Sequence, residues 1–427
     1  MLVEGGNEAW YEPVNPLFAD GDVFEHAATG GGGRRSHSAA AFELNLPMFR
    51  QLTVDLSGRY DYYSSDDAAS NSKFTYKAGI EYRPFDSLLL RGNYTTAFKA
   101  PDLSAIYLGP SNYFTQVTDY YRCALAGSQS CDRFTTDVMG QSRANRNLQP
   151  TTAQSWSAGT VWSPTERFSV SMDYLHTAVK DEVIAQDTDI LVRQDAQCLL
   201  GELDNSSPQC QAITNPVDGQ VQRGILNANL RNAVSILAAG PITGITTYYA
   251  NLANEVVDSV VATGRYQFVP TRWGKFDVQL AYSDMLKHDY QLAPGQLPID
   301  ELTNPLYNAG FKSIVNGTVN WVSADNRWKS TVYGRRYGAT PNFKAQNSGA
   351  NASGASSLHP WIAFNWTLAY EPTDDLSLSL LVNNIANKMP PRDRSNTTYP
   401  YFDVEDYNVY GREVMLQATY RFARGAR

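Results

Sequence analysis

The side chains that could carry out chemistry in this sequence are few and scattered. Its five histidines show no HExxH or similar metal-ligand spacing. No GxSxG turn marks a nucleophilic serine, and the paired carboxylates Asp66–Asp67 and Asp374–Asp375 are typical of solvated turns rather than of a calcium loop. We therefore expect no catalytic residue, no metal site and no cofactor, and we predict that the protein is not an enzyme. A hydrolase in which His176 or His288 meets a serine in space is the alternative.

The four cysteines form two local pairs in polar, loop-like stretches. Seven residues separate Cys123 from Cys131, and eleven separate Cys198 from Cys210. Four cysteines allow three pairings, and sequence does not choose among them, but the shorter loops Cys123–Cys131 and Cys198–Cys210 close most easily. Such disulfides indicate an oxidising compartment. Four free thiols are the alternative, whereas the missing CxxC spacing and the lack of a nearby histidine disfavour zinc.

Composition limits the class of protein. The 427 residues carry a net charge of −8, which argues against a nucleic-acid partner. Only 18% of residues are charged, and 26 are tyrosines. No apolar run is long enough for a membrane-spanning helix, because the closest stretch, residues 233–253, is broken by Gly240, Pro241 and Gly244. These features favour an all-β chain, either a sandwich array or a large membrane barrel.

Apolar and polar residues alternate along much of the chain, as in a strand with two different faces. Between Leu52 and Tyr62 the polar residues fill the odd positions. The alternation returns near residues 168–174, 276–282, 364–370, 376–382 and 414–422. Short connections lie near 46–51, 84–87, 163–166, 270–275, 323–327 and 371–375, and long ones near 64–73, 99–150, 184–243, 288–307, 340–358 and 389–406. Short turns that alternate with long loops predict an antiparallel transmembrane β-barrel.

About thirteen strands can be counted, beginning near residues 36–46. The first and the last would then run in the same direction, and an antiparallel barrel cannot close with such ends. Either one strand is missed or the chain is part of a larger barrel. Residues 1–35 are interpreted as an irregular segment or the tail of an extracellular loop. Met1–Trp10 has no basic start and no apolar stretch, so no signal peptide is predicted.

Several segments resemble the C-terminal part of the barrel of TonB-dependent outer-membrane receptors. Arg91–Pro101 is similar to the family's strand that ends in Phe-Arg-Ala-Pro, with Lys99 in place of Arg. Asn147–Pro150, followed by Ser155, Gly159 and Pro164, is similar to a segment that usually reads Asn-Leu-Lys-Pro-Glu. Val382–Lys388 resembles the penultimate strand. Residues 411–422 resemble the family's terminal strand, and they include Val414, Leu416, Tyr420 and Phe422.

The resemblance implies an outer-membrane receptor of a Gram-negative cell, with its loops outside. It implies uptake of a scarce nutrient: a ferric siderophore, cobalamin, haem or a carbohydrate. The implied partners are outer-membrane lipid, the small ligand, the inner-membrane TonB complex and the barrel assembly machinery. Family barrels have about 22 strands around an N-terminal plug. Neither plug nor TonB box is found here, and five residues follow Phe422. We therefore expect residues 36–427 to be the C-terminal portion of such a barrel, in a fragment without the plug.

A loop rich in aromatic residues is the candidate ligand site. Its rings can stack on a flat ligand or a sugar. They are Tyr107, Tyr113, Phe114, Tyr120 and Tyr121. Arg91 inside the barrel could bind an anionic ligand. The alternatives are that the rings pack among themselves or join an interfacial girdle, and that the arginines pair with nearby carboxylates. A passive porin or structural barrel, or a secreted soluble β binding protein, is the alternative function.

Overall fold

The fold was analysed in a computed structural model of the chain. The structure describes residues 1–19, 29–128, 130–215, 218–225, 239–304, 310–342, 356–395, 399–404 and 406–422. No helix among these residues is long and apolar enough to cross a membrane.

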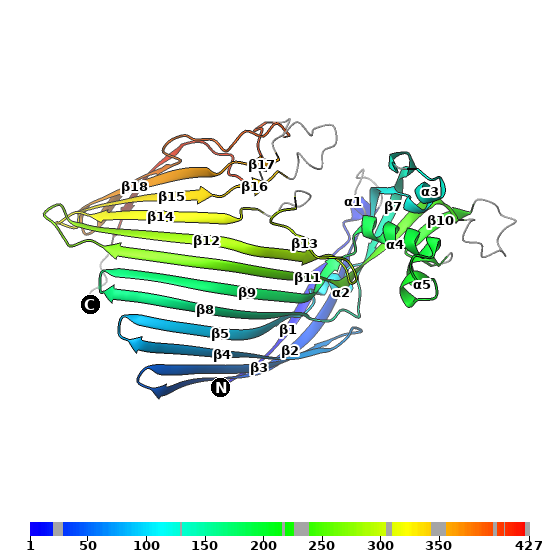
Figure 1. The fold of residues 1–427 in the computed structure, drawn as a ribbon, viewed down its shortest axis with the longest axis horizontal. Helices are drawn as coiled ribbons and strands as arrows, with labels where there is room; N and C mark the ends of the chain where they lie inside the picture. The colour runs from blue at the N-terminus through cyan, green and yellow to red at the C-terminus, as the bar shows by residue number, and fades with distance from the viewer. Residues whose placement is uncertain are drawn as a thin grey trace.

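Fourteen long strands pair in chain order into one antiparallel sheet (Figure 1). They are β1 (Leu2–Glu12), β2 (Gly31–Phe49), β3 (Leu52–Ser65), β4 (Asn71–Phe85), β5 (Leu88–Lys99), β8 (Thr151–Thr165), β9 (Phe168–Ala185), β11 (Ala239–Gln267), β12 (Lys275–Gln291), β14 (Ser313–Val322), β15 (Trp328–Tyr337), β18 (Trp361–Thr373), β19 (Leu376–Asn383) and β20 (Glu413–Tyr420). The predicted all-β antiparallel architecture is confirmed.

Thirteen of these strands match those counted in the sequence, and β1 is the one that was missed. Residues 2–12 are therefore a strand rather than an irregular segment. The register pairs β1 with β2 from Leu2–Ala41 to Glu12–Gly31. Among the described residues, no register joins β1 or β20 to a second strand, so the sheet has two open edges.

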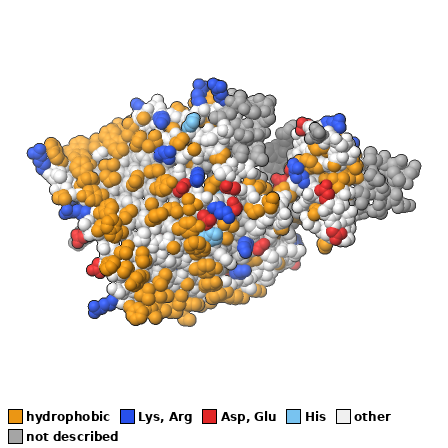
Figure 2. Space-filling view, viewed as in Figure 1, with side chains coloured by type: hydrophobic (Ala, Val, Ile, Leu, Met, Phe, Trp, Pro, Cys, Tyr) orange, Lys and Arg blue, Asp and Glu red, His pale blue; other side chains and the backbone are white. Residues whose placement is uncertain are grey.

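The alternation along the strands gives the sheet one apolar face and one polar face. Leu44 lies opposite Leu56, and Leu56 lies opposite Ala78, whereas the next row joins Asn45 to Asp55. Leu44 is 47% exposed, so its face is apolar without being buried. Figure 2 shows charged side chains gathered in the middle of the visible face, and hydrophobic side chains over much of the surface nearer the short turns. This arrangement is that of a membrane barrel, in which lipid covers one face.

All six predicted short turns are present, and they lie together at one end of the sheet (Figure 1). Their bounds shift by a few residues, because strand pairing continues into Phe49, Phe85 and Thr165. The long connections leave from the opposite end. Three of them carry the short elements α1 (Pro16–Ala19), β13 (Ile299–Asp300), β16 (Thr340–Pro341) and β17 (Ser357–Leu358).

Two long connections, predicted as loops, instead fold together into a compact unit that we call the outer lobe. It contains β6 (Ser111–Thr118), α3 (Tyr120–Leu125), the 3₁₀ turn η1 (Asp132–Phe134), β7 (Thr135–Arg143), α4 (Thr188–Leu200), α5 (Pro208–Thr214) and β10 (Val221–Ile225), with α2 (Leu103–Tyr107) nearby. The start of β11 completes it by pairing in parallel with β7. Buried apolar side chains from both connections form its core: Val117, Val138, Leu191, Val192, Ile213, Val221, Ile242 and Ile245.

Candidate functional site

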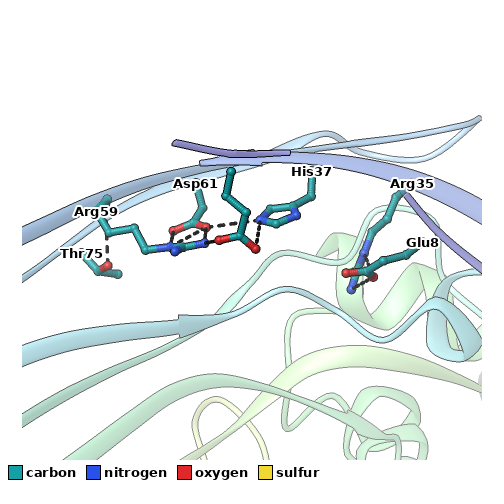
Figure 3. A network of polar contacts seen from close by, with 7 residues as sticks. Glu8, Arg35, His37, Arg59, Asp61 and Thr75 are labelled. Atoms are coloured by element: carbon teal, nitrogen blue, oxygen red, sulfur yellow. Dashed lines mark hydrogen bonds and ion pairs between the residues drawn. The ribbon is translucent and has the colours of Figure 1, made fainter. Parts of the chain in front are cut away.

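Charged side chains from neighbouring strands form a network on the polar face of the sheet (Figure 3). Arg59 and Asp61 lie two residues apart on β3 and so share a face, with Arg59 Nε 2.9 Å from Asp61 Oδ1. Arg59 Nη2 also donates to Glu4 Oε2 of β1 at 3.1 Å. His37 of β2 completes the group, because its Nε2 lies 3.8 Å from Asp61 Oδ1. Arg59 is thus paired with Asp61, in agreement with the alternative that the arginines inside the barrel pair with nearby carboxylates.

The predicted ligand residue Arg91 is also paired. Its Nε and Nη2 donate to the two carboxylate oxygens of Asp173 at 2.8 and 2.6 Å. The pair crosses β8 at Gly159, which lies opposite both residues in the register. A Cβ on Gly159 would lie 1.9 Å from Asp173 Oδ1, so the strand needs glycine where the ion pair passes. An anionic ligand at Arg91 would have to displace Asp173.

Two shallow hollows flank these pairs. One of about 460 Å³ is lined by Arg91, Asp173 and Lys77 among others. A second of about 470 Å³ is lined by Arg35, Arg59, Asp61, Tyr63 and Lys99 among others. Both walls contain paired charges of both signs, so they offer polar contacts to a ligand without a strong field of one sign.

Two of the five aromatic candidates belong to the framework of the outer lobe. The Tyr121 side chain is 1% exposed, and the guanidinium of Arg223 lies 5.3 Å from its ring centre. Arg193 lies 4.0 Å from the ring of Tyr120, whose hydroxyl donates to Asp189 at 2.6 Å. These two rings therefore contact arginine and aspartate side chains of the lobe rather than one another.

The other three aromatic candidates have different surroundings and do not share contacts. Tyr107 of α2 donates its hydroxyl to the carbonyl of Asp66. The hydroxyl of Tyr113 is 3.3 Å from Thr247 Oγ1. Phe114 is 81% exposed and is the member of the set most open to a partner. The five rings therefore do not form a single stacking platform.

Disulfides and one buried arginine hold the outer lobe together. The structure joins Cys123 to Cys131 and Cys198 to Cys210, the pairing that loop closure favours. Arg223 of β10 donates to Asp119 at 2.9 and 3.0 Å. It also donates to Asp195 of α4, with the shorter contact at 2.5 Å.

The charges of this triad are almost fully buried. Asp195 is 0% exposed, and its Oδ1 has no hydrogen-bond partner among the described residues. Burial raises the pKa of Asp195 to about 6, although Arg223 pulls in the opposite direction. One arginine faces two carboxylates here, so the buried group has a net negative charge until a proton is added.

Sequence reasoning missed two histidine–carboxylate contacts between strands. His176 Nδ1 lies 2.6 Å from Asp258 Oδ1, and His288 Nε2 lies 2.7 Å from Glu255 Oε1. Glu301 approaches the same His288 nitrogen at 3.3 Å. Asp258 lies directly opposite His176 in the register, but a long connection separates β9 from β11, so no short turn fixes that register in the sequence. Glu255 lies opposite Tyr290, two residues from His288, so the second contact is diagonal. In the described part of the chain, no group of three His, Cys, Asp or Glu side chains could hold a metal ion.

The comparisons with known proteins agree with this geometry. The family model for the β-barrel of TonB-dependent receptors matches residues 5–385, which is most of the chain. The chain belongs to the TonB-dependent receptor family. This family consists of receptors whose barrels lie in the outer membrane. No curated protein gives a significant match.

Solved structures of TonB-dependent receptors share the fold at low sequence identity. The siderophore receptor PirA of Acinetobacter baumannii has a TM-score of 0.58 and 15% identity, over 91% of this chain and 46% of PirA. A mutant of the ferric enterobactin receptor PfeA of Pseudomonas aeruginosa has a TM-score of 0.56 and 14% identity, over 92% of this chain and 45% of PfeA. The FrpB iron transporter of Neisseria meningitidis has a TM-score of 0.51 and 12% identity, over 98% of this chain and 52% of FrpB. The chain spans about half the length of these receptors.

The segments that carry the resemblance fall on strands of this barrel sheet or directly beside them, because Asn147–Pro150 precedes β8 and Val382–Lys388 begins at the end of β19. Arg91–Lys99 is on β5, and Ser155 and Gly159 are on β8. Val414, Leu416 and Tyr420 are on β20, with Phe422 just beyond it and 4.9 Å from Tyr420 between ring centres. Residues 423–427 lie outside the described residues.

Proposed function

We propose that this chain forms part of an outer-membrane receptor that takes up a ferric siderophore, energised by the TonB complex. The observation that carries the proposal is the receptor family model along residues 5–385, on strands that alternate between an apolar and a polar face. The ligand class rests on the structural neighbours, which include receptors for siderophores and for ferric enterobactin. The fold supports membrane residence.

We further propose that the described strands complete a larger barrel. The open edges of β1 and β20 and the coverage of about half of each neighbour support this. In the assembled receptor, outer-membrane lipid would cover the apolar face and the barrel assembly machinery would insert the sheet. The polar face would line the interior. Hydrogen bonds between neighbouring strands all around the barrel would satisfy the backbone polar groups in lipid.

Fractionation of the source cells tests the location and size of the protein. An antibody against residues 407–422 is used on membrane and soluble fractions, with boiled and unboiled lanes. The proposal expects an outer-membrane band well above the mass of this chain that shifts on boiling. A band of the chain's own mass, 47.3 kDa, in the soluble or inclusion fraction would contradict it.

An uptake assay tests the ligand. The complete reading frame is expressed in cells that lack their own siderophore receptors, and uptake of radioactive ferric enterobactin is measured with and without TonB. TonB-dependent uptake supports the proposal. If the receptor reaches the outer membrane but only other siderophores enter, the ligand class is supported and ferric enterobactin is not the ligand. If no ferric siderophore in a panel enters, the ligand class is wrong.

A further inference from the structure

A pocket of about 250 Å³ lies between the outer lobe and the end of the sheet. Ile190 and Leu191 of α4 and Ile213 of α5 supply apolar wall on the lobe side. The sheet side supplies Leu252 of β11 together with residues 292–294 after β12. Leu191 and Ile213 are each 2% exposed, so this wall is anchored in the lobe core. The pocket is separate from Arg91 and from the network around Arg59.

Glutamine amides supply the polar groups of the pocket, at Gln186, Gln194, Gln209 and Gln220. The orientation of two of them follows from their partners. The Tyr248 backbone N–H donates to Gln186 Oε1 at 3.0 Å, so that atom must be the oxygen. Gln220 Nε2 donates to the same oxygen at 2.6 Å and to the carbonyl of Thr246 at 3.3 Å.

Within this pair of glutamines, these bonds leave one donor and one acceptor available. The donor is Gln186 Nε2 and the acceptor is Gln220 Oε1, neither of which has a partner among the described residues. Gln220 is only 9% exposed, so its amide is held in place rather than free on the surface. A ligand that supplies one acceptor and one donor would pair with both atoms.

The lining carries almost no charge. Its one ionisable residue is Asp187, whose Oδ1 accepts the Ile190 backbone N–H at 2.9 Å and so caps α4. No lysine, arginine or histidine lines the pocket. A ligand here must bring both donors and acceptors and offer apolar surface to Leu252 and Ile213, and the Asp187 carboxylate disfavours an anion.

We propose that this pocket binds one neutral sugar unit. A pyranose ring has hydroxyl groups that both donate and accept, and C–H faces that pack on aliphatic walls. Its size suits a pocket of about 250 Å³. The site would hold a glycan at the outer end of the receptor, and it does not depend on the ligand that the receptor transports.

The test uses the receptor in detergent and saturation-transfer NMR, with methyl α-D-glucopyranoside and methyl β-D-galactopyranoside as probes. Glucuronate and glucosamine, which carry opposite charges, are the comparison ligands. At least one neutral glycoside is expected to bind, and glucuronate is expected to bind more weakly than the neutral glycosides and glucosamine. Equal binding of glucuronate, or no binding of any neutral probe in this pair, would overturn the proposal.

Two glutamines on one helix give a matched pair of variants. Gln194 lines the pocket, whereas Gln197 is exposed on the same helix outside the lining. Gln194→Leu should weaken glycoside binding about three- to tenfold through the loss of a hydrogen bond, and Gln197→Leu should leave it unchanged. Ala212→Phe, which adds bulk at the lining on α5, should abolish binding. If both Gln194→Leu and Ala212→Phe bind normally, the sugar occupies another place and the proposal is wrong.

Discussion

Arg91 on β5 reaches Asp173 on β9 across the intervening strand β8, where Gly159 leaves room for the ion pair. The three residues lie in one row of the register, so the contact ties three strands on the polar face. Side chains normally interact with the nearest strand, and a contact to the second strand requires a very small residue on the strand between them. Gly159 thus has a role in the barrel wall that packing on β8 alone would not reveal.

Gly159→Ala should therefore disturb the Arg91–Asp173 pair. Its Cβ would lie 1.9 Å from Asp173 Oδ1 and 3.0 Å from the Met172 carbonyl, so the carboxylate must leave. Because the Arg91 side chain is 44% exposed, we discount the pair for solvent screening and expect a loss of about 1 kcal/mol. The midpoint of heat modification on gels measures this change.

Gly264→Ala is the control, because a Cβ on Gly264 of β11 meets nothing within 4 Å. It should leave the midpoint unchanged or raise it slightly, as alanine restricts the unfolded chain. Equal effects of the two substitutions would show that Gly159 is not needed for the ion pair.

Arg223→Met should loosen the outer lobe. The substitution removes the cation from between Asp119 and Asp195 and leaves two buried carboxylates without it. Loss of one partner from a buried charge network costs about 3–5 kcal/mol. Trypsin should then cut the lobe at a clearly higher rate, while the barrel should still change its gel mobility on boiling.

The matched variant is Arg193→Met on α4. Arg193 pairs with Asp189 at 2.7 Å, but both side chains are more than half exposed. The exposed ion pair contributes about 0.5 kcal/mol or less and the cation–π contact of Arg193 with Tyr120 about 0.5–1 kcal/mol, so cleavage should change far less than in Arg223→Met. If Arg223→Met is no more sensitive to trypsin than Arg193→Met, the triad does not hold the lobe.

The buried triad should make the lobe more stable in mild acid. The pKa of Asp195 rises from 3.8 to about 6 on folding, mainly through burial, so the folded lobe binds this proton more readily than the unfolded chain. The stabilisation from the proton is complete below the unfolded pKa and is lost as the pH rises through about 6. From pH 7 to pH 5 we expect a gain of about 1 kcal/mol, read from hydrogen exchange in α4.

Asp195→Asn isolates this effect. The amide carries no titrating proton, so the gain between pH 7 and pH 5 should disappear while the Arg223 contact to Asp119 stays. An unchanged pH response in Asp195→Asn would assign the effect to another group.

Local patterns predicted most of the barrel sheet but not the outer lobe. Alternation is visible within a single strand, and each disulfide joins cysteines 8 or 12 residues apart. Strand β1 was missed because Gly5, Gly6, Glu4 and Glu8 interrupt its apolar pattern. Its pairing with β2 outweighs the weak strand preference of these residues.

The lobe could not be predicted because its contacts join distant parts of the chain. Arg223 and Asp119 are 104 residues apart, and nothing in the residues around either one indicates the other. Contacts between distant parts of the chain also explain why the aromatic loop could not be interpreted from its sequence alone. Tyr121 was a candidate ligand residue in a long loop, but it is buried, and Arg223 of the other connection lies 5.3 Å from its ring centre.

The two faces of β2 can be tested with one substitution on each. Leu44 is on the apolar face, and its neighbour Asn45 is on the polar face, where it donates to Asp55 at 2.5 Å. An arginine that faces lipid near the middle of a membrane costs about 2–4 kcal/mol. We therefore expect Leu44→Arg to reduce the heat-modifiable receptor in the outer membrane several-fold. Asn45→Arg should be tolerated, because the new cation faces Asp55. If the two variants accumulate equally, the Leu44 face does not meet lipid and the membrane assignment of this sheet fails.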